Sequence, residues 1–171
     1  RTSALAGSIR ATTSVSPAST PATTSGTTRI SIPGRTGTGA VGIEALSRGA
    51  SDATLIDNAP EAIDTIKDNL ASTRLIERAR VVRQDAFRFL RGQPREFDFI
   101  YVAPPQYVGL WSKALQALDA APGWLAENGE ILVQIDPSEF QALTLKNFEL
   151  VDERKYGKTL VCFYQRPEIE V

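Results

Sequence analysis

The sequence contains no histidine, one cysteine and no long apolar run. The absence of histidine excludes a His-based catalytic triad, the commonest zinc sites and the side chain that most often acts as general base. The single Cys162 can form no intramolecular disulfide, which fits a reducing compartment. No apolar run reaches the roughly 20 residues of a membrane-spanning helix. We therefore expect neither a membrane protein nor a metal enzyme.

An excess of positive charge is also lacking, because the net charge is −1. Residues 1–36 hold four arginines and no acidic residue, which leaves 15 basic and 20 acidic residues for the rest. Such a chain is not a salt-driven nucleic-acid binder, so any RNA contact must use a local patch. Seven arginines are candidates for a phosphate-facing patch or for an ordinary solvated surface: Arg74, Arg78, Arg80, Arg83, Arg88, Arg91 and Arg95.

The first 28 residues differ in composition from the rest of the chain. They are rich in Ser, Thr, Ala and Pro, with no aromatic residue and no hydrophobic period. Such a segment buries too little apolar surface to offset the entropy of ordering it. We predict a disordered or atypical segment over residues 1–28 and one folded domain over residues 29–171.

From Gly37 onward, short apolar strands alternate with helices. The pattern predicts strands at 53–56, 80–83, 97–102 and 130–135, and helices at 39–48, 60–70, 87–90 and 111–118. Two further strands, 148–153 and 159–165, form a hairpin around Gly157. This order predicts an α/β, Rossmann-like, seven-stranded and mostly parallel sheet covered on both faces, with a C-terminal antiparallel hairpin. Its first strand is expected to be poorly formed or atypical.

Ligands of such sheets bind beyond the carboxyl ends of the strands. The first loop there carries Gly37, Gly39 and Gly42 as GxGxxG, which suits a phosphate or carboxylate at a helix N-terminus. The pattern is equally typical of a dinucleotide-binding loop, and a plain turn before a helix is the remaining interpretation. Asp57 ends the next strand, where it can accept ribose hydroxyls or cap a helix. Asp85 ends the third strand, where it can accept an adenine amine or act as a cap. The interpretation as a site depends on all three occurring in order.

The fourth strand ends in Pro104-Pro105, which is the most specific of these signals. Two prolines stiffen the backbone and leave carbonyl groups with which no proline N–H competes. A simple strand terminator is the other interpretation.

Four segments together resemble successive motifs of the RsmD family, the bacterial 16S rRNA guanine-N2 methyltransferases: GTGAVGIEALSRGA, LIDNAPEAIDTIKDNL, VVRQDAFRFL and FDFIYVAPPQYVGLW. A closing hairpin is also typical of the methyltransferase sheet. The resemblance implies S-adenosylmethionine as cofactor. It also implies a cofactor site made of Gly37, Thr38, Gly39, Gly42, Asp57, Asn58, Asp85 and Ala86, with Asp57 at the ribose and Asp85 with Ala86 at the adenine. The implied catalytic segment is Ala103, Pro104, Pro105, Gln106 and Tyr107.

The chain departs from the family pattern in that segment. Ala103 stands where the family has Asn or Asp, and Tyr107 is one position later than the family's aromatic residue. We expect the Pro104 carbonyl to accept one hydrogen bond from the target amine, and Gln106 or the Ala103 carbonyl to accept another. Tyr107 is the candidate for stacking on an extruded base.

The resemblance predicts methyl transfer to a guanine in small-subunit rRNA by a monomer in the bacterial cytoplasm, with ribosomal RNA or the small subunit as partner. Three alternatives remain at this point. An NAD-dependent oxidoreductase would use the same glycine loop and Asp57. A DNA amino-methyltransferase shares the motif of the fourth strand. A non-catalytic relic would have lost its activity with the change to Ala103.

Overall fold

The computed structural model describes the backbone of residues 28–32 and all of residues 37–168. The segment predicted to be atypical therefore lies outside the described residues, apart from Thr28. The strands are β1 (Thr28–Ile32), β2 (Asp52–Asp57), β3 (Ala79–Arg83), β4 (Phe97–Val102), β5 (Leu125–Ile135), β6 (Glu149–Tyr156) and β7 (Thr159–Gln165). The helices are α1 (Ala40–Ser47), α2 (Pro60–Ser72), α3 (Ala86–Leu90) and α4 (Leu110–Ala120), and short 3-10 turns cover Ile76–Arg78, Pro122–Trp124 and Pro137–Glu139.

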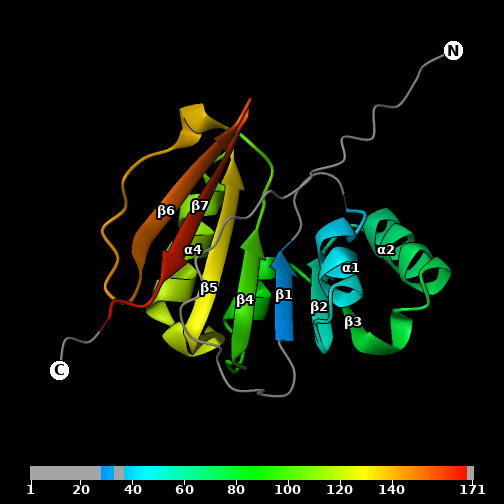
Figure 1. The fold of residues 1–171 in the computed structure, drawn as a ribbon. Helices are drawn as coiled ribbons and strands as arrows, with labels where there is room; N and C mark the ends of the chain where they lie inside the picture. The colour runs from blue at the N-terminus through cyan, green and yellow to red at the C-terminus, as the bar shows by residue number, and fades with distance from the viewer. Residues whose placement is uncertain (1–27, 33–36, 169–171) are drawn as a thin grey trace, which may run out of the picture.

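The strands form one sheet in the order β3-β2-β1-β4-β5-β7-β6. Strands β1 to β5 pair in parallel, and β7 pairs antiparallel with both β5 and β6. Figure 1 shows β1 in the middle of the row, with β2 on one side and β4 on the other. The chain thus winds outward in two directions from β1, which creates a switch point between β1 and β4 where a ligand crevice is expected.

Strand β1 corrects one prediction, because it is well paired rather than poorly formed. Thr28 to Ser31 pair in register with β2, and Arg29 to Ile32 pair with β4. The Ser/Thr-rich composition of the preceding residues hid a run with three β-branched residues at alternate positions, Thr28, Ile30 and Ile32, which favours extended backbone. A ladder on each side then fixes this short segment.

Strand β5 starts five residues before the predicted position. The turn-like residues from Glu127 to Gly129 lie within it, and the pairing with β4 shifts register between Phe97 and Phe99. Gly129 is buried at this irregularity, where an added Cβ would lie 3.0 Å from the Asp98 carbonyl oxygen. The glycine therefore permits a close backbone approach inside a strand instead of ending one.

Helices cover both faces of the sheet. On β2, the adjacent residues Leu55 and Ile56 point in opposite directions because side chains alternate along a strand. Leu55 packs in a cluster with Leu46 of α1 and Ile66 of α2, whereas Ile56 packs in a larger cluster with α3 and α4. The α/β class is confirmed. Among residues 37–168, no helix is long and apolar enough to span a bilayer.

Candidate functional site

A cavity of about 320 Å³ lies at the carboxyl ends of the parallel strands. Its wall combines the ends of β2, β3 and β4 with the first residues of α2, α3 and α4. The lining residues are Gly37, Ile56, Asp57, Asn58, Ala59, Ala62, Gln84, Asp85, Ala86, Phe87, Leu90, Val102, Pro104, Pro105, Leu110 and Ala114. The cavity therefore brings together residues from all four sequence segments in which a site was predicted.

Asp57 is held in a fixed orientation at the end of β2. Its Oδ1 accepts a hydrogen bond of 2.9 Å from the backbone N–H of Ala59, just before Pro60 begins α2. The other oxygen, Oδ2, is directed toward the glycine loop and lies 3.6 Å from the position that a Cβ on Gly37 would take. One oxygen thus organises the local turn, and the second faces the cavity wall where a ligand hydroxyl can donate to it.

The glycine loop divides into one cavity residue and two packing residues. Gly37 lines the cavity, and a Cβ there would lie only 2.4 Å from the Cβ of Ala62 on α2. Added Cβ atoms on Gly39 and Gly42 would instead each meet Leu55 Cδ2 at 2.9 Å, beneath α1. Gly39 also has a φ of +71°, which favours glycine. Gly39 and Gly42 allow α1 to pack closely on β2 and do not line the cavity.

Thr38, the remaining predicted residue of the loop, is exposed and has a structural partner. Its carbonyl oxygen accepts a hydrogen bond of 2.9 Å from Asn69 Nδ2 of α2. This bond ties the start of α1 to α2. Thr38 does not line the cavity.

The position of Asp85 is compatible with both roles considered from the sequence, as a helix cap and as a ligand-binding residue. Its Oδ1 accepts a hydrogen bond of 2.9 Å from the backbone N–H of Arg88, so it caps α3. The same residue lines the cavity together with Ala86 and Phe87. The backbone N–H of Gln84 donates to the Asp57 carbonyl oxygen at 2.9 Å, which ties the two acidic strand ends together.

The loop after β4 places only its two prolines at the cavity. Pro104 and Pro105 line it, whereas Ala103, Gln106 and Tyr107 do not. Tyr107 is 68% exposed and has a φ of +64°, unusual for a residue with a side chain.

Two hydrogen bonds to residues after β5 hold Tyr107 in place. Its hydroxyl donates to Asp136 Oδ2 at 2.9 Å, and its backbone N–H donates to Glu139 Oε1 at 2.6 Å. The bond to Asp136 raises the pKa of the Tyr107 phenol, and hydrogen bonds from Ser138 lower the pKa of Asp136. Tyr107 therefore links the loop after β4 to the loop after β5, a contact that sequence spacing could not reveal.

Sequence reasoning missed the apolar part of the cavity. Ile56 and Val102 sit at or just before the strand ends, and Leu110 and Ala114 face the cavity from successive turns of α4. The i, i+4 spacing of Leu110 and Ala114 was a visible signal, but it is equally typical of a core-facing helix. Among residues 37–168, no group of three or more His, Cys, Asp or Glu residues could hold a metal.

Three features define a Rossmann-like domain of the methyltransferase type. They are a parallel sheet whose strand order reverses at β1, a cavity at the strand ends and a terminal antiparallel hairpin. Solved structures share this fold. A conserved hypothetical protein of Streptococcus pyogenes aligns over 83% of this chain and 87% of its own, with a TM-score of 0.74 and 25% identity. YhhF of Escherichia coli aligns over 82% of this chain and 76% of its own, with a TM-score of 0.73 and 31% identity.

Related sequences narrow the class further. The ribosomal RNA small subunit methyltransferases D of Escherichia coli and Haemophilus influenzae are 33% and 30% identical, over 76% and 77% of this chain. YlbH of Bacillus subtilis is 34% identical over 76% of the chain. Residues 28–165 match the family described as conserved hypothetical protein 95. This chain belongs to that family, the RsmD family of rRNA methyltransferases. The matches span 65%, 69% and 72% of the lengths of the three relatives.

Proposed function

We propose that this protein transfers a methyl group from S-adenosylmethionine to the exocyclic N2 amine of a guanine in 16S ribosomal RNA. The observation that carries the proposal is the single cavity that joins Gly37, Asp57 and Asp85 to Pro104-Pro105. The residues that we assign to the cofactor and to the target amine thus line one crevice at the switch point of the sheet. The names of the small-subunit relatives support the choice of RNA.

The cavity suits an adenosyl ligand in both volume and chemistry. The Asp57 carboxylate would accept hydrogen bonds from the ribose hydroxyls, and Asp85 with Ala86 would meet the adenine edge. Phe87 and Ile56 supply apolar surface for the ring. When bound, the cofactor supplies an electrophilic sulfonium methyl group. A solved structure of similar fold, that of SMU.776, is described as complexed with SAH, at 16% identity and a TM-score of 0.66.

The backbone after β4 would activate the target amine. An exocyclic guanine amine is a weak nucleophile because its lone pair is delocalised into the ring. Carbonyl acceptors aimed at its N–H groups localise that lone pair, and the Pro104 carbonyl is the first candidate. Ala103 has no polar side chain, so the second acceptor would be a main-chain carbonyl or Gln106, whose side chain would have to turn toward the cavity. Catalysis would then consist of positioning and electrostatics, which require no histidine.

The test is calorimetry followed by methyl transfer. We expect S-adenosylhomocysteine to bind the purified chain and NAD not to bind. Tritiated methyl groups should then appear on 16S rRNA, supplied both naked and in assembled small subunits, and nuclease digestion should locate them on guanine N2. NAD binding without S-adenosylhomocysteine binding would favour an oxidoreductase. Cofactor binding without transfer to either substrate would contradict the rRNA proposal, and a further assay with DNA would then distinguish a DNA amino-methyltransferase from a relic.

A further inference from the structure

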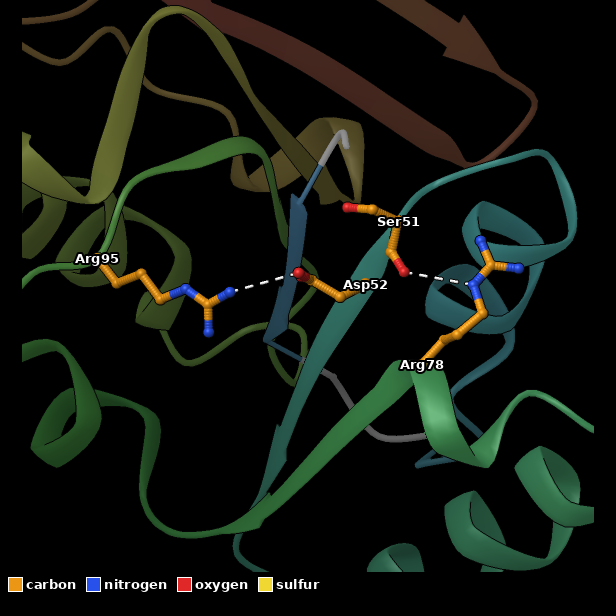
Figure 2. Close-up of polar contacts among 4 residues, drawn as sticks. All are labelled: Ser51, Asp52, Arg78 and Arg95. Carbon is orange, nitrogen blue, oxygen red and sulfur yellow. Dashed lines mark hydrogen bonds and ion pairs between the residues drawn. The ribbon is translucent and has the colours of Figure 1, made fainter. Parts of the chain in front are cut away.

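The seven arginines between residues 74 and 95 do not act alike, because two of them hold the chain in place. Arg78 donates from Nε to the Ser51 carbonyl oxygen at 3.3 Å and from Nη2 to the Ala50 carbonyl oxygen. Arg95 forms an ion pair of 3.3 Å with Asp52 (Figure 2). Both contacts fix the entry to β2. Arg78 is therefore a structural residue rather than a free phosphate ligand.

Three of the arginines meet at a second cavity, of about 220 Å³, on the other flank of α3. Arg80 of β3, Arg88 of α3 and Arg95 line this cavity, which we call the arginine pocket, and no carboxylate is among its lining residues. Two glutamines, Gln84 and Gln93, add further amide groups. In a chain whose net charge is −1, this is a local concentration of positive charge.

Aromatic side chains form a rigid wall of the arginine pocket. The ring centroids of Phe89 and Trp124 lie 5.1 Å apart, and those of Phe97 and Trp124 lie 6.1 Å apart. Trp124 is also fixed by a hydrogen bond of 3.1 Å from its Nε1 to the Leu90 carbonyl oxygen. The aromatic wall thus gives the pocket a packed floor, over which the Arg95 guanidinium lies.

The guanidinium groups differ in how far they are already engaged. Arg95 is oriented by Asp52 and lies 5.8 Å from the centre of the Phe97 ring, yet its side chain is still 53% exposed. Within residues 37–168, no ion pair engages Arg80 or Arg88. An anion that enters this cavity therefore meets at least two uncompensated charges beside a third that is held in position. Phosphate oxygens match the fork of donors on arginine.

We propose that the arginine pocket binds a backbone phosphate of the RNA substrate, an inference that rests on the proposed function. Helix α3 separates this pocket from the cofactor cavity: Ala86, Phe87 and Leu90 line one, and Arg88 and Phe89 line the other. Gln84 lines both. An RNA strand anchored here has to continue past α3, from the amino-terminal ends of β4 and β5, to reach the cofactor cavity that Gln84 also borders. The pocket thus gives an acidic chain the local RNA contact that its overall charge does not provide.

The test measures how binding of a 16S rRNA transcript depends on salt in the full chain and in the variant R80Q/R88Q. We expect the slope of log Kd against log salt to fall by about 0.7 to 0.9 for each phosphate that the variant no longer neutralises, with roughly a three- to tenfold weaker Kd at physiological salt. S-adenosylhomocysteine affinity should not change, because neither side chain lines the cofactor cavity. If the double variant melts early, R88Q alone is measured instead. Its side chain is separate from the backbone N–H that Asp85 caps.

The matched control is R91Q, at the C-terminal end of the same helix but outside the arginine pocket. It should keep the wild-type slope. An unchanged slope in R80Q/R88Q, an equal loss in R91Q, or no RNA binding by the wild type would each overturn the inference. Inorganic phosphate that binds the wild type while the RNA slope is unchanged in R80Q/R88Q would identify a small-anion site instead. Failure of S-adenosylhomocysteine to bind the wild type would contradict the proposed function separately.

Discussion

Replacing Gly37 with alanine tests the steric design of the cofactor cavity. The new Cβ would lie 2.4 Å from the Cβ and 3.1 Å from the Cα of Ala62, near the start of α2. Neither atom is at the end of a flexible side chain, so relief requires the loop or the helix to move. Because the same Cβ would lie 3.6 Å from Asp57 Oδ2, that movement would displace the carboxylate we assign to the ribose.

The expected change in the free energy of unfolding of G37A is the sum of two opposing contributions. Overpacking typically costs about 1–3 kcal/mol, whereas a Gly-to-Ala change in compatible backbone gains about 0.4–1 kcal/mol through the unfolded state. We expect G37A to lose about 1–2 kcal/mol in the free energy of unfolding and to bind S-adenosylhomocysteine more weakly. A62G removes the opposing methyl group and should itself cost about 0.5–1 kcal/mol as a glycine in a helix. In G37A/A62G the 2.4 Å contact is removed and only the 3.1 Å contact with the Cα at position 62 remains, so the two losses should not add.

The wild type, G37A, A62G and G37A/A62G form a double-mutant cycle. Each protein is measured by urea denaturation and by calorimetry with S-adenosylhomocysteine. A favourable coupling of about 1 kcal/mol or more between the two positions is the expected result. G123A is the matched control, because the nearest atom to its added Cβ is Pro94 Cβ at 3.3 Å, away from the cavity. Additive losses in the double variant, or wild-type affinity in G37A, would refute the steric reasoning.

Three further predictions follow from single contacts. D57A should weaken S-adenosylhomocysteine binding by about 1–3 kcal/mol, since the ribose hydroxyls lose their acceptor. D57N keeps an oxygen that can accept from the Ala59 N–H, so calorimetry should show weaker binding while Tm is nearly unchanged. Wild-type affinity in both variants would remove Asp57 from the site. Y107A should lower methyl transfer to RNA about tenfold to a hundredfold while leaving cofactor affinity intact, and Y107F should keep most activity; a destabilised Y107A whose folded fraction works normally would contradict the stacking role. Burial raises the pKa of the Cys162 thiol to about 11 from an ordinary 9.0, so the folded state keeps a proton that the unfolded state loses, and stability falls as pH rises from about 9 to 11. Urea midpoints should fall less in C162A across that range, and an equal fall would show that other groups are responsible.

The strand ends could be predicted from the sequence because they combine two local signals, an apolar run and a polar residue or proline that stops it. Asp57, Asp85 and Pro104-Pro105 all reach one cavity for this reason. Strand β1 could not be judged in the same way. Its formation depends on two neighbouring ladders, and no local feature of a sequence measures how well a partner strand fits.

The position of Tyr107 was beyond sequence reasoning for a different reason. Its partners, Asp136 and Glu139, lie about 30 residues away, on a loop whose position depends on the length of β5. The prediction that Tyr107 stacks on a base stays a prediction. The structure adds that the residue begins from a hydrogen-bonded position at the surface, which a bound base would have to share or displace.

The packing of Gly39 and Gly42 against Leu55 has a consequence for how glycine motifs are interpreted. If most of a GxGxxG pattern serves to bring a helix onto a strand, any protein with that helix–strand distance will carry it, whatever small molecule it binds. The pattern then indicates that a helix packs closely on a strand, and it carries little information about which ligand is bound. Under the proposed function, ligand identity depends instead on residues that line the cavity, the two strand-end carboxylates and the proline pair. A search for distant cofactor relatives should therefore weight those four positions above the glycines.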